Sequence, residues 1–352
     1  MNNFFLIFLI LLIIINMLIC YNANLIANFF KLIDYPDKKR KIHSTPTPLT
    51  GGLIFFINIF LFSIFDMLTG SHPVTGSQLF FDIRIISIKQ LAIFLIASFS
   101  IYIVSFYDDI YDIRPFRKIL SFLLILYVLL ISNPNISIRQ LQFYNFESNI
   151  YFDNFSVYLT LFCMLAFMNA ANMFDGLNLQ SSILYSSFLL IFFLKGIDQK
   201  FLLILLISLI FFTYMNMKGK IFLGNNGSYF LSFLISIIII TDHNWNKNYY
   251  TEEIFLYLMI PGIDMIRLTI IRFIKNKSPF EGDDNHLHHL LIKKFNYKNS
   301  MIIIFVMIFT PIILYNFFEI NPLLLIILSF IIYLTILLIC LKKNIKRHKI
   351  GK

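Results

Sequence analysis

Long apolar runs recur along the whole chain of 352 residues and are separated by short polar segments. Most runs approach the roughly 20 residues that an α-helix needs to cross the hydrocarbon core of a bilayer. Because backbone N–H and C=O groups need internal partners in hydrocarbon, these runs should be helices. The runs lie at roughly 4–20, 53–69, 91–107, 119–132, 155–170, 181–194, 201–217, 224–241, 253–271, 301–317 and 323–341. The pattern predicts an all-α polytopic integral membrane protein with about 11 transmembrane helices.

Composition and charge agree with this picture, since 58% of the residues are apolar and 14% are charged. The basic residues behind the net charge of +10 follow the expected membrane topology and do not form one basic surface, which argues against a nucleic-acid partner. If the N-terminus lies outside, 22 of the 29 Lys and Arg fall in loops on the inside. This bias is expected, because cytoplasmic loops of membrane proteins carry an excess of Lys and Arg. We therefore expect a cytoplasmic C-terminus, a basic cytoplasmic tail at 342–352 and a single membrane-embedded domain over 1–352. The outside loop at 133–154 contains ISIRQLQF, whose alternation predicts a small hairpin.

In this topology the conspicuous polar clusters share the cytoplasmic face. They are KRKIHSTPTPLTGG (39–52), YDDIYDIRP (107–115), NAANMFDGLN (169–178), GNNGS (224–228), and the stretch from PGIDMIRLTIIRF into SPFEGDDNHLHHLL (261–291). A common face is where a soluble, charged substrate can reach a partner embedded in the membrane. The clusters therefore predict one site assembled from distant parts of the chain.

The acidic cluster places Asp108, Asp109 and Asp112 within one turn at the expected C-terminal end of a helix. Like charges at this spacing repel each other, and the helix dipole disfavours anions at this end. The arrangement favours a cation in the site, such as Mg²⁺, a nearby Lys or Arg, or a proton held on one carboxyl. A solvated helix end with basic counter-ions is the simpler alternative.

The other clusters contain groups that suit phosphate. Asn169 and Asn172 lie three residues apart on one helix face, and GNNGS opens a helix whose bare N–H groups attract phosphate. His286, His288 and His289 can donate hydrogen bonds to phosphoryl oxygens. Interhelical amide bonds, a plain turn and a surface loop are the corresponding structural explanations. A zinc site fits less well, because H-x-H-H lacks a fourth ligand at a familiar spacing.

One chemistry uses all of these groups. A nucleotide diphosphate needs a cation, basic side chains and backbone N–H groups around it, while a lipid phosphate stays in the membrane with its head at the surface. Phosphoryl transfer between the two depends mainly on positioning and on stabilisation of negative charge.

The motifs also resemble those of a known family. TP-x-P-x-x-GG, DD-x-x-D, N-x-x-N-x-x-DGL, G-N-x-GS, P-x-x-D and SPF-x-GD-x-x-H-x-HH follow one another between about residues 35 and 292. This order is similar to that of the polyprenyl-phosphate N-acetylhexosamine-1-phosphate transferases of glycosyltransferase family 4. These membrane enzymes begin O-antigen, enterobacterial common antigen and teichoic acid synthesis, and phospho-N-acetylmuramoyl-pentapeptide transferase is a relative. NHLHHLL resembles the N-acetylglucosamine-type branch more.

The resemblance implies roles for individual residues. The acidic pair near the lipid phosphate corresponds to Asp108 and Asp109, the catalytic candidates. The ligands of Mg²⁺, for which Mn²⁺ is a substitute, correspond to Asn172 and Asn225. The nucleotide-sugar site corresponds to Asn169, Asp175, Asn178 and Phe222, with Phe222 against uracil. The groups that bind diphosphate or the lipid head correspond to Lys41, His43, Arg272, His286, His288 and His289.

The implied reaction moves a sugar 1-phosphate from a UDP-N-acetylhexosamine to undecaprenyl phosphate and releases UMP. The implied location is the bacterial inner membrane, with the active site at the cytoplasmic face; a homodimer is left open. One position departs from the family pattern, because Asn225 stands where GD-x-GS has Asp. An amide brings no charge to a metal, which puts the metal affinity and the activity in doubt.

Other classes of protein explain fewer of the clusters. An intramembrane prenyltransferase also uses DD-x-x-D with Mg²⁺, but it needs a second aspartate-rich motif, and Asp264 alone is a poor substitute. A transporter for a lipid-linked or anionic solute would place polar residues near the bilayer midplane or break helices in two similar halves. A catalytically degenerate family member is the third alternative, because of Asn225.

Overall fold

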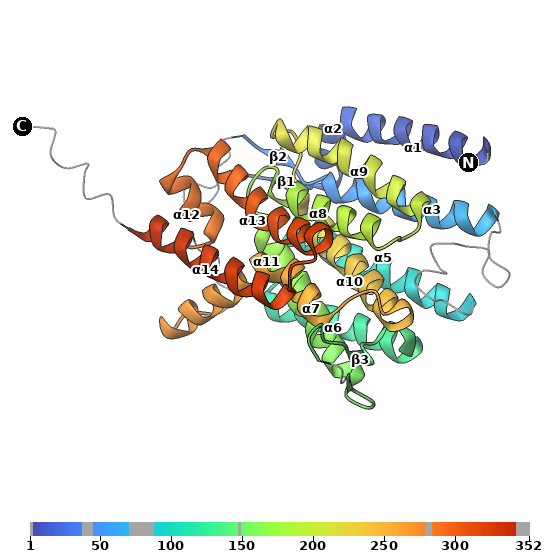
Figure 1. Cartoon of the computed structure of the whole chain (residues 1–352). Coiled ribbons are helices and arrows are strands. Elements are labelled where there is room, and N and C mark those ends of the chain that lie inside the picture. Colours follow the sequence, from blue (N-terminus) through green and yellow to red (C-terminus); the bar gives the residue numbers. More distant parts are fainter. Residues whose placement is uncertain (1–2, 37–44, 70–87, 147–148, 279–283, 343–352) are drawn as a thin grey trace, which may run out of the picture. The chain divides into compact units, whose positions relative to one another are not determined.

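The computed structural model describes residues 3–36, 45–69, 88–146, 149–278 and 284–342 of the chain (Figure 1). Within these ranges, ten helices are long and apolar enough to cross a membrane. The prediction of an all-α polytopic membrane protein is therefore confirmed. The remaining predicted span, at 181–194, corresponds to α8 (Gln180–Leu194), which has only 15 residues. At about 1.5 Å per residue it is about 22 Å long, which is shorter than a typical hydrocarbon core.

The chain runs through its helices and strands in the following order. They are α1 (Asn3–Tyr21), α2 (Ala23–Phe30), β1 (Ile33–Asp34), β2 (Thr47–Pro48), α3 (Gly51–Thr69), α5 (Ile88–Tyr111), α6 (Pro115–Ser132), η1 (Pro134–Ile136), β3 (Gln140–Leu141), β4 (Ile150–Tyr151), α7 (Ser156–Phe174), α8, α9 (Gln199–Met217), α10 (Gly224–Asn246), α11 (Thr251–Ile274), α12 (Leu287–Lys294), α13 (Tyr297–Phe318) and α14 (Pro322–Leu341). The short helices α2 and α12 were not predicted from the sequence.

The chain divides into two compact units, residues 1–251 and 252–352, and each is described by itself. Whether 1–352 acts as one domain stays a prediction, as do the outside N-terminus and the cytoplasmic C-terminus. Of the basic tail, only Lys342 lies within the described residues.

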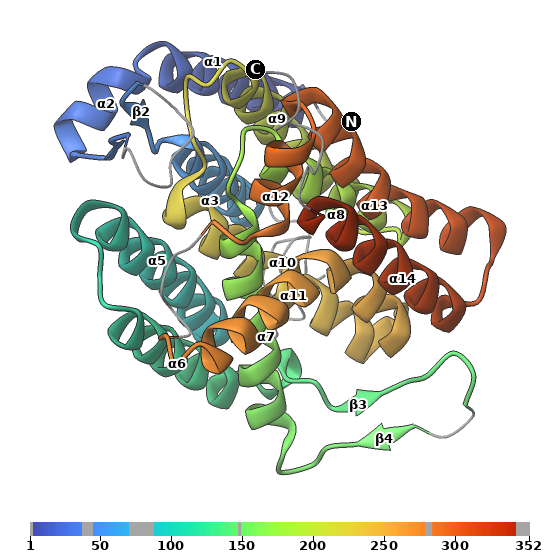
Figure 2. The ribbon, with the colours of Figure 1, turned by 90° about the vertical axis from the view of Figure 1, so that its left-hand side faces the viewer.

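Helix α10 forms the centre of the first unit (Figure 2). It packs against α3, α5 and α7, and every residue from Asn226 to His243 is buried. A helix that is apolar on all sides is typical of such a central position. The hydroxyl groups of Ser232, Ser236 and Thr241 donate to carbonyls one turn earlier in the same helix, as where Ser232 donates to the Ser228 carbonyl at 2.6 Å. The centre of the unit is therefore one helix whose two ends reach opposite faces.

The outer helices expose large apolar side chains, which is expected of surfaces that face lipid. Helix α1 is attached to the unit by a buried polar contact as well as by apolar packing. The Asn58 amide on α3 donates to Asn16 on α1 at 3.0 Å and to the Ser208 hydroxyl on α9 at 2.7 Å. These bonds join three helices inside the apolar interior.

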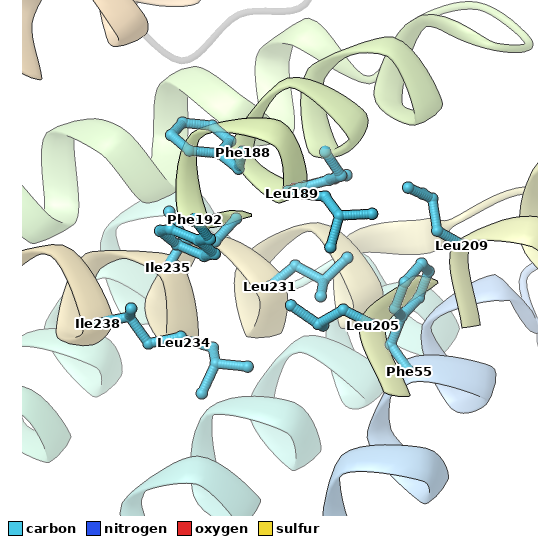
Figure 3. Close-up of a pocket in the computed structure, with 11 residues that line it drawn as sticks. Phe55, Phe188, Leu189, Phe192, Leu205, Leu209, Leu231, Leu234, Ile235 and Ile238 are labelled. Carbon is cyan, nitrogen blue, oxygen red and sulfur yellow. The ribbon is translucent and has the colours of Figure 1, made fainter. Parts of the chain in front are cut away.

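Figure 3 shows a small cavity among α3, α8, α9 and α10. Its wall is made almost entirely of hydrocarbon, from side chains such as Phe55, Phe188, Leu205 and Leu231. The one polar side chain among those that line it, Tyr185, already donates its hydroxyl to the Ser228 carbonyl at 3.2 Å, so this cavity does not suit a phosphate.

The predicted hairpin in 133–154 is confirmed (Figure 2). Strands β3 and β4 pair in antiparallel register, with Gln140 opposite Tyr151 and Leu141 opposite Ile150. A second short pair was not predicted and joins β1 to β2, with Ile33 opposite Pro48. This second pair leads directly into α3.

The second unit consists of most of α11 together with α12, α13 and α14. Leu256 and Met259 of α11 pack with Leu325 of α14 in its core. The short helix α12 packs against α13 and α14. This placement brings the histidine-rich segment against the membrane helices of its own unit.

Candidate functional site

The glycine pair that begins α3 and the glycine motif of α10 lie against each other. Gly51 donates its N–H to the Phe222 carbonyl at 2.9 Å, and Gly52 donates to the Leu223 carbonyl at 2.9 Å. A Cβ on Gly52 would lie 1.8 Å from Asn226 Oδ1 and 2.3 Å from the nitrogen of Gly227. Only residues without side chains allow this approach, so the two sequence motifs have one shared structural reason.

Asp109 caps the start of α10. Its carboxylate accepts the N–H of Asn225 at 2.8 Å, the N–H of Asn226 at 2.9 Å and the side-chain amide of Asn226 at 2.7 Å. A carboxylate at a helix N-terminus satisfies unpaired N–H groups and interacts favourably with the helix dipole. The sequence predicted that these N–H groups would bind phosphate, but in this structure an aspartate of the same protein occupies them.

Asp108 is buried and faces a different partner. Its Oδ2 pairs with the ammonium of Lys118 at 2.8 Å, and its Oδ1 accepts the N–H of Ile113 at 3.0 Å. The prediction that Asp112 lies in the same helical turn as Asp108 was wrong, because α5 ends at Tyr111 and Asp112 has a φ of 49°. The Asp108 carboxylate holds this loop through the Ile113 N–H, and the loop leaves the helix at this point.

Tyr229 of α10 connects the acidic pair to the asparagine cluster. Its hydroxyl donates to Asn169 Oδ1 at 3.4 Å, and the Lys118 ammonium lies 5.3 Å from the centre of its ring. The Asn169 amide also donates to the Leu165 carbonyl at 2.7 Å. The structure therefore brings described residues of four predicted clusters together around the first turns of α10: 39–52, 107–115, 169–178 and 224–228.

The loop after α7 contains two of the predicted nucleotide-sugar residues. Asp175 is half-buried at the end of α7, and burial raises its pKa to about 6, although the Ser181 hydroxyl opposes this. The loop is fixed to α9, because Leu179 donates its N–H to Asn216 Oδ1 at 2.6 Å. Asn178 is also half-buried there. A carboxyl with this pKa can exchange a proton near neutral pH.

Phe222 precedes α10 in an extended segment. Its N–H donates to the Pro48 carbonyl at 2.8 Å, and its side chain is half-buried. The backbone of this residue is therefore fixed by the β2 segment, next to the glycine contact.

In the second unit, buried Asp264 of α11 organises the histidine segment. It accepts from Arg267 at 2.7 Å, from the Tyr333 hydroxyl at 2.9 Å and from the N–H of Leu287 at 3.2 Å, while His286 Nδ1 lies 3.3 Å from it. Arg267 also donates to the Tyr333 hydroxyl at 2.8 Å. One carboxylate thereby fixes the beginning of α12 against α11 and α14.

The three histidines form a cluster at the start of α12. The ring centres of His286 and His288 are 5.2 Å apart, and those of His288 and His289 are 4.4 Å apart. His288 is buried, and this burial, together with its two histidine neighbours, holds the pKa of His288 well below its usual value. His289 is half-buried, and Arg272 is buried on α11. The predicted residues of this unit that are described thus lie on α11 and at the start of α12.

The donor set for a metal is limited. Among the described residues, no group of three or more His, Cys, Asp or Glu side chains could hold a metal ion. Within the same ranges, the side-chain amides of Asn172 and Asn225 form no hydrogen bond, so their oxygens are available as neutral ligands. Lys41 and His43, predicted to bind phosphate, lie outside the described residues.

Several residues that hold these groups in place were not predicted from the sequence. They are Asn226 and Tyr229 in the first unit and Tyr333 in the second. Lys118 is the nearby basic counter-ion that the sequence offered for the acidic cluster, and Asp264 and Arg267 lie within the predicted cluster at 261–291. Asn226 lies within GNNGS, so its motif gave a signal. Tyr229 and Tyr333 lie inside apolar runs, where no pattern distinguishes a functional tyrosine from a core residue.

Comparison with known proteins bears on the family. A sequence profile of glycosyl transferase family 4 matches residues 91–243. An undecaprenyl-phosphate alpha-N-acetylglucosaminyl 1-phosphate transferase from Salmonella typhi is 24% identical over 285 residues, which cover 77% of this chain and 72% of the relative. Proteins of the same name from Escherichia coli (24% over 290 residues; 78% and 73%) and Haemophilus influenzae (25% over 281 residues; 76% and 74%) are similar. The resemblance inferred from the motifs is therefore confirmed.

Proposed function

We propose that this chain, a relative of glycosyl transferase family 4, transfers an N-acetylhexosamine 1-phosphate from a UDP-sugar to undecaprenyl phosphate and releases UMP. The gathering of four motifs around the start of α10 is the observation that supports this most strongly. The names of its relatives support the same acceptor and a GlcNAc-like sugar.

In the proposed reaction, an oxygen of the lipid phosphate attacks the β-phosphorus of the UDP-sugar. A new P–O bond forms, the bond from that phosphorus to the bridging oxygen breaks, and UMP leaves with the electron pair. Asp108 engages the lipid phosphate, or accepts its proton, before attack. Lys118, paired with Asp108, places a positive charge where phosphate oxygens approach. The reaction then proceeds by direct attack.

Asp109 has a positioning role in this proposal. Its three hydrogen bonds to Asn225 and Asn226 fix α10 relative to α5. The orientation of Asn225 and of Tyr229, one turn further along, depends on that contact. Asp109 therefore supports the site through α10 even if it never touches a substrate.

A Mg²⁺ ion, or Mn²⁺ in its place, would be held by the amide oxygens of Asn172 and Asn225. Oxygen ligands suit Mg²⁺, and both amides are available, so the donor set fits; neither amide brings charge. When bound, the ion supplies positive charge to the diphosphate. The negative charge that the site lacks comes from the diphosphate itself.

The second unit would bind the donor. Arg272, His286, His288 and His289 can donate hydrogen bonds to the diphosphate or the sugar, and neutral His288 contributes as a hydrogen-bond donor. In the first unit, Asn169, Asp175, Asn178 and Phe222 would contact the nucleotide-sugar, with Phe222 against the uracil ring. The site would lie at the cytoplasmic face of the bacterial inner membrane, at the first membrane step of cell-surface polysaccharide synthesis.

The test is an assay of the purified protein in lipid nanodiscs with undecaprenyl phosphate, Mg²⁺ and a panel of UDP-N-acetylhexosamines, reading UMP release. Asp108→Asn should lower turnover by about two orders of magnitude, the scale of a lost acid–base or charge-bearing group. Asp153→Asn is the matched control, because Asp153 is exposed beside the hairpin at the other end of the helices.

Two results would contradict the proposal in different ways. Near-normal turnover of Asp108→Asn would remove the role assigned to this residue. If the folded protein turned over none of the sugars, the alternative of a catalytically degenerate relative would be favoured.

A further inference from the structure

The hairpin of β3 and β4 lies at the end of α10 opposite to the candidate site. Helix α10 has 23 residues, which corresponds to about 34 Å, the thickness of a hydrocarbon core. Asp109 contacts the first turn of this helix, whereas the hairpin contacts its last turn. The hairpin is therefore separated from the proposed chemistry by the depth of the membrane.

The inner strand of the hairpin is fastened to the helices. His243 Nε2 lies 2.9 Å from the Gln140 carbonyl oxygen, and the Asn244 side-chain amide donates to the Ser137 carbonyl at 2.7 Å. The N–H of Thr251 donates to the Gln142 carbonyl at 2.7 Å. The segment is therefore held in a fixed position rather than tethered as a loose loop.

The outer strand is different, because its apolar side chains are exposed. Tyr151 is 66% exposed and Ile150 is 48% exposed, and Phe146 and Phe155 on either side are 64% and 72% exposed. A fixed strand edge with this many exposed apolar side chains would be an aggregation site if it faced water. Something other than water should therefore surround it.

These side chains continue a stripe on α7. Phe155, Tyr158 and Phe162 lie at positions i, i+3 and i+7 on one helix face, and all three are exposed. In a membrane-spanning helix, an exposed apolar stripe faces lipid. The exposed aromatic side chains of the hairpin begin where this stripe ends.

We propose that the outer strand and its flanking aromatic residues lie in the headgroup layer of the adjoining leaflet. We call this set the interfacial patch; it consists of Phe146, Ile150, Tyr151, Phe155 and Tyr158. Tyr, like Trp, is enriched at this depth, because its ring is apolar while its hydroxyl can bond to water or headgroups, and the apolar neighbours of the two tyrosines can reach the start of the acyl chains. Exposed Arg139, held by Asn135 at 2.8 Å, lies next to β3 and can pair with lipid phosphates.

A protein strand is a poorer occupant of this edge. Strand β4 has only two residues, so it offers few backbone groups to a strand that would pair with it. The lipid surface needs no such pairing. The proposal is independent of the reaction proposed for the other end of the helices.

The single tryptophan of the chain makes a direct test available. Trp245→Phe removes it, and Tyr151→Trp in that background gives a reporter within the interfacial patch. The full-length protein is reconstituted in phosphatidylcholine vesicles that contain a minority of phosphatidylcholine labelled with a quencher near the headgroup or deep in the acyl chain. Aqueous iodide is the third quencher.

We expect the shallow label to quench Tyr151→Trp at least about twofold more than either the deep label or iodide, as for a side chain at headgroup depth. Phe162→Trp in the same background is the matched control. It lies on the same stripe seven residues further along α7, so the deep label should quench it more than the shallow label does. If Tyr151→Trp does not fold, Phe155→Trp takes its place.

Two outcomes would overturn the proposal. Quenching mainly by iodide would show that the interfacial patch faces water. Protection from all three quenchers would show that a protein, including a second copy of this chain, covers the patch.

Discussion

At the scale of single residues, Asp108 and Asp109 are neighbours in sequence but serve different partners. Successive residues on a helix point about 100° apart, so one carboxylate reaches Lys118 and the other reaches the start of α10. Repulsion between the two carboxylates is therefore offset by an ammonium for one and by helix N–H groups for the other. In the proposed reaction, the DD pair combines a reacting group, Asp108, with a structural one, Asp109.

The Asn225 position leads to a prediction about Mg²⁺. An amide oxygen brings no charge, so the free enzyme should bind Mg²⁺ weakly and depend on the donor diphosphate to hold the ion. Asn225→Asp should therefore shift the half-activating Mg²⁺ concentration downward, by about tenfold if the added charge is worth about 1.4 kcal/mol. The measurement is an Mg²⁺ titration of UMP release for both forms at a fixed UDP-sugar concentration. Coincident curves would exclude residue 225 as a ligand.

The burial of His288 leads to a prediction about pH. Its pKa is lowered in the folded protein, so the folded state keeps it neutral while the unfolded state takes up a proton near pH 6.5. The unfolded state then binds more protons below that pH, and stability is lost as the pH falls through about 6.5.

The slope from this one group should approach about 1.4 kcal/mol per pH unit between pH 6.5 and 5.5. His288→Asn removes the titrating group and should flatten the dependence of the unfolding free energy on pH. The measurement is denaturant unfolding in detergent at pH 7.5, 6.5 and 5.5. Equal slopes for the two proteins would show that His288 takes up its proton in the folded state as well.

At the scale of elements, the close approach of α3 and α10 holds the first unit's motifs together. A Cβ on Gly227 would lie 2.7 Å from the Cα of Gly52, and backbone atoms cannot rotate away as a flexible side chain can. The contact places the start of α3, the start of α10 and the Asp109 cap in one fixed arrangement. The two glycine motifs are therefore packing motifs that carry the site.

Substitution of these glycines should show this directly. Gly52→Ala and Gly227→Ala should each lower the free energy of unfolding by about 1–3 kcal/mol or more, the cost of overpacking. Gly262→Ala is the control, because nothing lies within 4 Å of the Cβ position there and alanine favours the helix. Thermal unfolding of the three variants in detergent is the measurement. A melting temperature for Gly52→Ala equal to that of Gly262→Ala would contradict the close packing.

At the scale of the whole molecule, the distribution of charge predicts which face is which. The first unit has the site motifs at one end of α10 and the hairpin at the other. The excess of Lys and Arg in the loops on the motif side should place that side in the cytoplasm. The structure shows which residues lie at the same end of α10, and the distribution of charge predicts the side of the membrane on which that end lies.

Labelling of introduced cysteines can test the orientation. In a background without Cys20, Cys163 and Cys340, a membrane-impermeant maleimide should label Asn154→Cys in intact cells and Lys220→Cys only after the membrane is opened. Both positions are exposed. The reverse pattern would contradict the orientation and the cytoplasmic location of the site.

The sequence alone determined the fold class and the positions of most of the spans. Apolar runs of membrane length can satisfy their backbone groups only as helices, so even the short run at 119–132 became α6. The alternation in ISIRQLQF was sufficient for the hairpin. The motif order was sufficient to indicate the resemblance to glycosyl transferase family 4, because each motif carries several residue types at fixed spacing.

Only the tertiary structure decided how these groups are used. The N–H groups of GNNGS suited phosphate by sequence, yet Asp109 occupies two of them, because the end of α5 packs against the start of α10. Asp112 leaves the helix face because α5 ends one residue earlier. The tyrosines that connect Asn169 to Lys118, and Asp264 to Arg267, lie in apolar runs. Their hydroxyls acquire partners only when separate helices pack together, which no local pattern records.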